Sequence, residues 1–361
     1  MREGWKRMKI ADICEKASSN IALNKIQNID GDYPIYGASG YIKNVNFYHR
    51  DRAYIGIVKD GSGVGRVNTY PPMTSLLGTM QYILPKDGYC LGYVAYALKS
   101  LNLVSFASGA AIPHIYFRDY GQCEIDVPSI QEQERIVAEL DLLTGIIDKQ
   151  KQQLKELDTL AQSIFYDMFG SPDANEKEWI MKSLAEIGTI VSGSTPSTSD
   201  ESNWDGDVNW VTPAELGVQL FYGETRRKIT SKAAKSLTIM PIGTLLMSSR
   251  APIGKLAITS VPMCCNQGFK NIVCGNNVNN IYLYYCLMLN INSIKAMGRG
   301  ATFKEVSKQA VSSFEIMLPP MNLQELFAQK ILSIESQKKS INRSIAESQK
   351  LFDYTMDKYF C

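Results

Sequence analysis

Histidine, a frequent residue of catalytic and metal sites, is nearly absent from this chain of 361 residues. Only His49 and His114 occur, and no two of the eight cysteines form a Cys-x-x-Cys pair. These absences argue against a zinc site and against a Ser/His/Asp catalytic arrangement. Scattered cysteines of this kind fit reduced thiols in a cytoplasm better than a disulfide framework. We therefore expect no metal site.

Motifs for nucleotide chemistry are also missing. The glycines of Asp60–Val67 are followed by no Lys-Ser or Lys-Thr, and Gly254-Lys255 has Ser249 where a phosphate-binding loop needs its first glycine. A glycine-rich hairpin that presents Lys59 and Arg66 is the alternative that we favour for the first stretch. No Asn/Asp-Pro-Pro-Tyr motif of adenine methyltransferases occurs, and no nuclease core with the required spacing. We expect a chain that catalyses no reaction by itself.

Long hydrophobic runs and a strong charge imbalance are lacking as well. The longest apolar run, Ile281–Leu289, is far shorter than the roughly 20 residues that a membrane-spanning helix needs. No signal-peptide pattern is seen, so we expect a cytoplasmic protein without a membrane partner. The chain has 38 basic and 36 acidic residues, a net charge of +2. This balance does not by itself indicate nucleic-acid binding.

What the sequence does contain is a long amphipathic helix, predicted over residues 129–170. Apolar residues recur there at alternating steps of four and three, the heptad spacing of a coiled coil. At 1.5 Å per residue, the helix would be about 60 Å long. Such a length suggests a rod that holds two parts apart, although a long helix packed on its own domain remains an alternative. The predicted seam contains Ile136, Leu140, Leu143, Ile147, Leu154, Leu157 and Ile164.

The same pattern returns over residues 319–361. Val127-Pro128 before the first helix corresponds to Leu318-Pro319 before the second, and the apolar seam follows at the same distance. The second seam is weaker, because Lys338 and Ser348 stand at positions that are otherwise apolar. We expect the two seams to pack helices together. The second seam contains Phe327, Ile331, Ile334, Ile341, Ile345 and Phe352.

The regions before the two helices also correspond. Trp5–Ile13 matches Trp179–Ile187, and a predicted short helix at Leu91–Leu101 matches Ile281–Leu289. Turn residues at Gly170–Asn175 separate the two copies. The sequence therefore predicts an α+β fold built as a pseudo-two-fold tandem repeat. Its parts are a mixed α/β domain over 1–128, a helix over 129–170, a second such domain over 171–318 and a helix over 319–361.

Several stretches resemble the specificity subunit of type I restriction-modification systems, and the resemblance extends over essentially the whole chain. It implies two target recognition domains that each read one half of a split DNA site. It also implies that the two long helices pack antiparallel, set the spacing between the half-sites and carry the modification subunits. The stretches that carry the resemblance are Tyr33–Gly40, Pro128–Gln133, Ser192–Pro196, Trp210–Pro213, Ser248–Gly254 and Asn266–Phe269.

The resemblance implies a function in assembly and DNA recognition. The expected partners are double-stranded DNA, two modification (methyltransferase) subunits and restriction/translocase subunits. The complex would methylate adenine or cleave DNA. The methyl donor, ATP and Mg²⁺ would bind the partner subunits, and no cofactor is expected in this chain. An orphan DNA-binding scaffold of the same fold, without active partners, is the alternative. An enzyme acting on a small ligand is disfavoured, because acid/base clusters are missing.

Basic residues in glycine-rich stretches are the candidates for DNA contacts. Arginine and lysine side chains on such loops can reach base edges and phosphates. Arg250 has a second interpretation, since an arginine in a recurring motif can brace the fold instead. The candidates are Lys43, Lys59 and Arg66 in the first domain, and Arg226, Arg227, Arg250, Lys255, Lys270 and Arg299 in the second.

Overall fold

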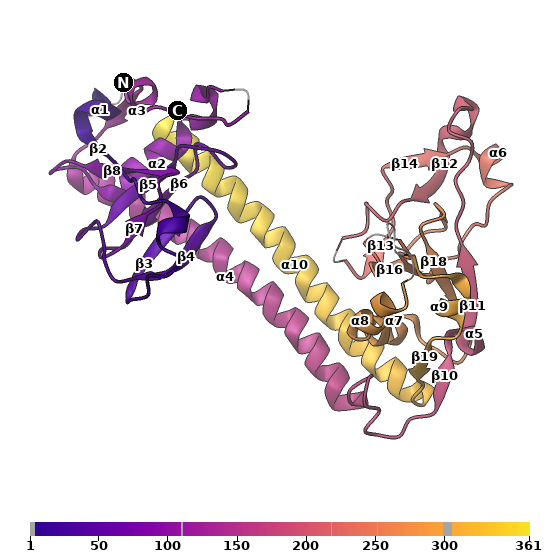
Figure 1. Cartoon of the computed structure of the whole chain (residues 1–361). Coiled ribbons are helices and arrows are strands. Elements are labelled where there is room, and N and C mark those ends of the chain that lie inside the picture. Colours follow the sequence, from indigo (N-terminus) through magenta and orange to yellow (C-terminus); the bar gives the residue numbers. More distant parts are fainter. Residues whose placement is uncertain (1–3, 110, 218, 251, 299–304) are drawn as a thin grey trace. The chain divides into compact units, whose positions relative to one another are not determined.

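The computed structural model describes residues 4–109, 111–217, 219–250, 252–298 and 305–361 (Figure 1). The chain forms two compact units. Unit 1 contains Met1–Gln152 and Asn342–Cys361, and unit 2 contains Gln153–Ile341. Each unit therefore consists of one globular head with a part of each long helix. This division differs from the four predicted segments, because the units divide both helices.

The head of unit 1 contains three small sheets and a short buried helix. Its strand orders are β2-β8-β5-β6, β4-β3-β7 and β1-β9. All five residues of β5 are buried, as a continuous apolar run in a central strand predicts. The elements are β1 (Lys6–Lys9), α1 (Ile10–Ile13), β2 (Cys14–Ser18), η1 (Leu23–Lys25), β3 (Tyr33–Gly37), β4 (Gly40–Val45), β5 (Tyr54–Val58), β6 (Val67–Tyr70), β7 (Ser75–Leu76), β8 (Met80–Pro85), α2 (Leu91–Ser100), η2 (Leu103–Phe106), α3 (Phe117–Tyr120) and β9 (Glu124–Val127).

The head of unit 2 has strand orders β11-β18-β15-β16-β13, β14-β12-β17 and β10-β19. Its elements are β10 (Met181–Ser183), α5 (Leu184–Ile187), β11 (Gly188–Ser192), η3 (Glu201–Asn203), β12 (Trp204–Val211), β13 (Phe221–Tyr222), β14 (Arg227–Ile229), α6 (Ser231–Ala234), β15 (Leu245–Met247), β16 (Leu256–Thr259), β17 (Cys264–Cys265), β18 (Lys270–Cys274), α7 (Asn280–Leu289), α8 (Ile291–Ala296), α9 (Lys308–Ser312) and β19 (Glu315–Met317).

The two heads repeat one topology. The sheet β2-β8-β5-β6 corresponds to β11-β18-β15-β16, to which unit 2 adds β13, and β4-β3-β7 corresponds to β14-β12-β17. The pairing register agrees, since Ser18 lies opposite Gln81 in unit 1 and Ser192 lies opposite Lys270 in unit 2. The predicted tandem repeat of two mixed α/β heads is therefore confirmed.

Each head is followed by a 40-residue helix, α4 (Ile130–Phe169) or α10 (Met321–Phe360). The helices run antiparallel within each unit. In unit 1, Arg135 donates to the Tyr359 hydroxyl at 2.9 Å, and Gln150 donates to the Ser344 hydroxyl at 2.7 Å. In unit 2, the Lys338 ammonium lies 2.6 Å from Asp158. Early residues of α4 thus pair with late residues of α10.

The predicted seams face the inside of each unit, with one difference. Ile136, Leu140, Phe327 and Ile331 are fully buried, whereas Leu154, Leu157, Ile341 and Ile345 are half-buried. Toward the end of α4 the buried residues are Ala161, Phe165 and Phe169, while the predicted Ile164 is half-buried. A straight α-helix with 3.6 residues per turn drifts about 20° per heptad away from a strict 3.5-residue repeat, and this drift explains the shift.

Lys338 occupies its seam position through ion pairs. Its ammonium contacts Asp158 at 2.6 Å and Glu335 at 2.7 Å. Burial lowers the pKa of Lys338, but the hydrogen bonds that its ammonium donates to the two carboxylates together outweigh burial and raise the pKa above its ordinary value. The polar residue that weakened the predicted seam is therefore compensated by neighbouring charges of opposite sign.

A buried glutamine joins each long helix to the short helix of the same head. Gln133 accepts a hydrogen bond from the backbone N–H of Cys90 at 2.9 Å and donates to the Pro128 carbonyl at 3.0 Å. Gln324 repeats this joint in unit 2, with Asn279 N at 2.8 Å and the Pro319 carbonyl at 2.8 Å. Cys90 and Asn279 precede α2 and α7, so each glutamine satisfies a helix-terminal N–H that has no intrahelical partner.

The apolar run predicted as a helix at Ile281–Leu289 forms α7, which is buried along most of its length. Helices that are apolar on all sides occur inside a core as well as in membranes. Among the described residues, no helix combines the length and the apolar character needed to cross a membrane.

Candidate nucleic-acid interface

The outer strand of the small sheet in unit 2, β14, begins at an arginine that lies over the ring of one tryptophan and near a second. The guanidinium carbon of Arg227 lies 3.7 Å from the ring centroid of Trp204 and 5.6 Å from that of Trp210. The two indoles meet edge to face, with centroids 5.1 Å apart. Arg227 itself is exposed, whereas Trp210 is buried. The aromatic pair thus holds a positive side chain at the surface of the head.

A serine-rich loop fixes both tryptophans. The indole N–H of Trp210 donates to the Ser194 carbonyl at 3.1 Å, and that of Trp204 donates to the Ser197 carbonyl at 3.2 Å. The loop is itself attached to β17, since Ser194 N donates to the Cys265 carbonyl at 2.9 Å. Three of the stretches that carry the family resemblance therefore meet at this sheet. The exposed Gln267 joins them through a 2.5 Å hydrogen bond from Thr195 to its side-chain oxygen.

Glu215 positions the residues just before β14. Its carboxylate accepts hydrogen bonds from the backbone N–H and the hydroxyl of Thr212, both at 2.9 Å. It also accepts from the Tyr222 hydroxyl at 3.1 Å and from Arg226 N at 2.8 Å. Burial, and then the Glu215 charge, raise the pKa of Tyr222, so the hydroxyl remains a donor. The backbone of Arg226 is fixed, while its side chain is exposed.

The other basic candidates of unit 2 are engaged within the head. Arg250 and Lys270 both pair with Glu305, at 3.0 Å and 3.3 Å, and Lys270 is buried. Burial acts to raise the pKa of Glu305, but the hydrogen bonds from Arg250 and Lys270 hold it below its ordinary value. Lys255 donates to the Pro213 carbonyl at 3.1 Å. These three residues brace loops, and the candidate Arg299 lies outside the described residues.

In unit 1, two of the three candidates are likewise paired. Lys43 contacts Asp30 at 2.9 Å and the Gln27 carbonyl at 3.1 Å, and Lys59 lies 3.7 Å from Asp60. Arg66 is exposed and donates to the Ala38 carbonyl at 3.0 Å. Arg66 is therefore the basic candidate of this unit that is most available for an added ligand.

The glycines around Arg66 shape a hairpin loop. Gly61, Gly63 and Gly65 have φ of 79°, 88° and 84°, a region that side chains with a Cβ rarely adopt. A Cβ at Gly65 would also lie 2.9 Å from the Val104 nitrogen. The loop connects the antiparallel strands β5 and β6, as the favoured interpretation of this stretch predicted.

The two histidines and the cysteines form no recognisable catalytic or metal centre in the part of the chain that the structure describes. His114 is hydrogen-bonded to Asp60, and its backbone pairs with Ser108. All eight cysteines are free thiols, and burial raises the pKa of Cys265 to about 12. Within the described ranges, no three His, Cys, Asp or Glu side chains are grouped to hold a metal ion.

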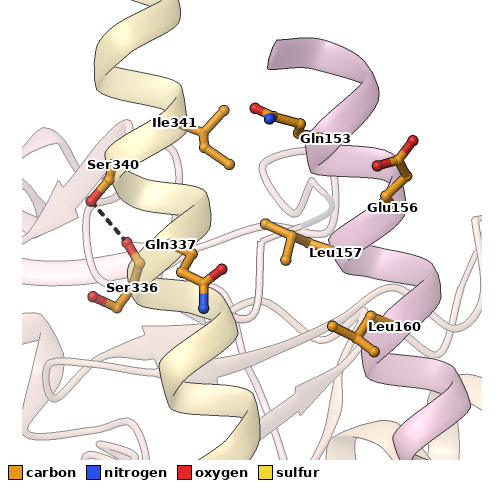
Figure 2. A pocket seen from close by; sticks show the side chains of 8 residues that line it. All are labelled: Gln153, Glu156, Leu157, Leu160, Ser336, Gln337, Ser340 and Ile341. Atoms are coloured by element: carbon orange, nitrogen blue, oxygen red, sulfur yellow. Dashed lines mark hydrogen bonds between the residues drawn. The ribbon is translucent and has the colours of Figure 1, made fainter. Parts of the chain in front are cut away.

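A second candidate surface lies between the long helices of unit 2. It is a groove of about 610 Å³ into which Leu157 and Leu160 of α4 and Ile341 of α10 point (Figure 2). Leu160 is 48% exposed. The sequence predicted Leu157 and Ile341 as packing residues but did not single out Leu160. Polar side chains border the groove: Gln153, Glu156, Ser336, Gln337 and Ser340.

Two copies of one α/β head, each followed by a long helix, define a tandem-repeat scaffold. The chain belongs to the type I restriction modification DNA specificity domain family, whose sequence model matches residues 2–159 and again residues 176–348. The double match agrees with the repeat seen in the fold.

Relatives with curated names include specificity subunits of type I restriction enzymes. The MjaIX specificity subunit of Methanocaldococcus jannaschii is 39% identical over 158 residues, which cover 42% of this chain and 37% of that protein. The putative MjaX specificity subunit of the same organism is 25% identical over 272 residues, 69% of this chain and 61% of the relative. An Escherichia coli specificity subunit is 26% identical over 289 residues, 75% and 70% of the two chains.

Solved structures share the fold. The S subunit of a type I restriction-modification system from M. genitalium aligns over 99% of this chain and 96% of its own, with a TM-score of 0.65 and 15% identity. A chain from a structural study of type I restriction-modification complex assembly aligns over 99% and 98%, with a TM-score of 0.59 and 18% identity. At these identities, the similarity supports the fold alone.

Proposed function

We propose that this chain is the DNA-binding specificity subunit of a type I restriction-modification complex and that it reads a bipartite, asymmetric target. The observation that carries the proposal is the repeated head in a family described by DNA specificity. Two similar heads suit two half-sites, as paired modules on DNA generally do. Their different side chains suit half-sites of different sequence.

The surfaces of the heads support DNA as the ligand. Arg226 and Arg227 lie exposed in unit 2 and Arg66 lies exposed in unit 1. Exposed arginines can bind phosphates and, in the major groove, guanine bases. The remaining candidates Lys43, Lys59, Arg250, Lys255 and Lys270 are engaged with neighbouring groups, so we assign them weaker contributions to binding.

The partners in the proposal are two modification subunits and the restriction/translocase subunits. The groove lined by Leu157, Leu160 and Ile341 offers an apolar surface of the kind that binds a partner helix. Adenine methylation and cleavage, together with the methyl donor, ATP and Mg²⁺, are assigned to those partners, and the complex is assigned to the cytoplasm. Support for the division of labour comes from the relatives, which are named specificity subunits.

Co-expression with the candidate methyltransferase subunit, followed by genome-wide mapping of N6-methyladenine, tests the proposal. We expect a split motif of two specified halves around a fixed gap. Exchange of one head for that of a relative should change one half alone. A stable complex that binds DNA but produces no new methylation would contradict this function and support the orphan scaffold instead.

A further inference from the structure

Arg227 differs from the other basic candidates of its head because its side chain lies over a tryptophan ring and forms no ion pair among the described residues. We propose that Arg227 reads a guanine in the half-site bound by unit 2 and is thus a specificity-determining residue. The proposal rests on the proposed function in DNA recognition. It goes further by assigning one side chain to one type of base, where a contact to the DNA backbone would carry no sequence information.

The first support is preorganisation. The guanidinium stacks on Trp204 at 3.7 Å, and both tryptophans are tied by their indole N–H groups to the loop at Ser194–Ser197. Stacking on an aromatic face leaves the five N–H donors in the guanidinium plane available. A side chain that is already held loses less conformational entropy on binding. The aromatic pair therefore presents a rigid donor fork to a ligand.

The second support is that the fork carries no competing partner. Arg250 and Lys270 share Glu305, but Arg227 forms no ion pair with any residue that the structure describes. A planar fork of donors matches the O6 and N7 acceptors of guanine in the major groove, and this bidentate pair is the commonest specific contact of arginine with DNA. Unpaired donors fixed at a surface are the arrangement that such a contact requires.

The third support is the place of Arg227 in the sheet. Strand β14 is the outer strand of β14-β12-β17, so no further strand of that sheet lies beyond it. A two-stranded β-ribbon fits the major groove of B-DNA, and several DNA-binding proteins read bases from strands placed there. Arg227 pairs in register with Trp210 of β12, and this pairing sets it beside the indoles.

The matching position of the first head shows what changes between the two copies. Trp210 lies opposite Arg227 and Cys264, and in unit 1 Ile35 lies opposite Lys43 and Ser75. Lys43 is therefore the equivalent of Arg227. It has no tryptophan as its cross-strand partner, and its ammonium is bound by Asp30. The same position of the repeated sheet therefore holds a proposed base-contacting residue, Arg227, in unit 2 and an ion-paired structural residue, Lys43, in unit 1.

The test is selection of bound duplexes from a random library by the full chain together with its methyltransferase partner. We expect the wild type to enrich a bipartite motif that includes a guanine in one half. Arg227→Ala and Arg227→Lys should lose the preference for that guanine by about 5- to 150-fold, the range of a bidentate base contact. All other positions of the motif should stay specified. Arg227→Lys keeps the positive charge but removes the planar guanidinium with its paired N–H donors. This variant therefore distinguishes a specific contact with the base from a general attraction by charge.

Arg226→Ala is the matched control. Arg226 is adjacent and exposed, but its backbone is held by Glu215, and its side chain stacks on no aromatic ring among the described residues. As a phosphate contact, it should weaken binding to all sequences alike and reduce the salt slope by about 1. Replacing the identified guanine by 7-deazaguanine, which lacks N7, should weaken the wild type but not Arg227→Ala.

Two results would overturn the inference. Arg227 variants that keep the whole motif and lose affinity uniformly would make Arg227 a phosphate contact, and the proposed function would survive. A wild-type complex that enriches no motif would overturn the proposed function and the guanine assignment together. Melting curves of each variant identify loss of fold, and Arg227→Lys provides the second variant where alanine destabilises the head.

Discussion

At the scale of single residues, burial and pairing divide the basic side chains into structural and available ones. Lys270 is only 8% exposed, and it shares the carboxylate of Glu305 with Arg250. Removing the carboxylate would leave a buried ammonium without its counter-charge, a costly change in a protein interior. Arg250 and Lys270 are thus tied to the stability of the head, which supports the bracing interpretation of Arg250.

This cluster predicts a pH-dependent loss of stability in Glu305→Gln. The pKa of Glu305 is lowered from 4.5 in the folded chain. The contribution of the Glu305 charge to the free energy of unfolding is therefore present above pH 4.5 and is lost as the pH falls through the lowered pKa. We expect Glu305→Gln to reduce the free energy of unfolding by about 1–2 kcal/mol at pH 7, from the hydrogen bonds to charged groups. Urea unfolding at pH 7 and near pH 3 measures the difference.

The difference in the free energy of unfolding between wild type and Glu305→Gln should shrink as the pH falls below 4.5, since protonation of Glu305 removes from the wild type the charge that the variant lacks. Glu315→Gln provides a control, because Glu315 is an exposed carboxylate of β19 in the same unit. A difference that stays constant down to pH 3 would show that the charge of Glu305 is not what stabilises the head.

At the scale of elements, each long helix depends on the glutamine at its beginning. Gln133 is 1% exposed and satisfies the Cys90 N–H and the Pro128 carbonyl. We expect Gln133→Leu to reduce the free energy of unfolding by about 1–3 kcal/mol, the cost of leaving a buried polar group unsatisfied. Gln131→Leu is the matched control, since Gln131 is exposed on the same turn. Chemical unfolding of the full chain gives both values.

If the Gln133→Leu and Gln131→Leu variants were equally stable, the hydrogen bonds of Gln133 to Cys90 and Pro128 would not stabilise the fold. Gln324→Leu should behave like Gln133→Leu but should affect unit 2, because the same contacts recur there with Asn279 and Pro319. Hydrogen exchange of the α2 and α7 amides separates the two sites, with faster exchange expected in the helix whose joint is removed.

The elements also show what the sequence could predict and what it could not. The spacing of apolar residues predicted both long helices, because helical periodicity is local in the sequence. The correspondence of stretches such as Trp5–Ile13 and Trp179–Ile187 predicted the repeat. The burial of Phe165 was not predicted, since it depends on helix drift and on its packing against Tyr282 and Phe327. The pairings of Lys43 with Asp30 and of Arg227 with Trp204 were also missed. The partners are separated in the sequence, so only the folded structure brings them together.

At the scale of the whole molecule, the repeat predicts that a partner binds twice. Leu160 is 48% exposed in unit 2, and the residue of α10 that corresponds to it in the repeat is Leu351, 52% exposed in unit 1. Exposed leucines next to a helix groove are typical of surfaces that bind an amphipathic helix. The proposed complex contains two modification subunits, and the two corresponding leucines would suit one such subunit on each unit.

Charge substitutions at these leucines test the stoichiometry. Leu160→Glu and Leu351→Glu should each reduce the number of modification subunits bound from two to one, because a buried unpaired carboxylate opposes docking. Leu332→Glu is the control, since Leu332 is 47% exposed on α10 but does not line the groove. Native mass spectrometry of the co-purified complex counts the subunits. Two subunits retained in both leucine variants would show that the partner docks elsewhere, whereas loss of both in either variant would show that the two units do not bind independently.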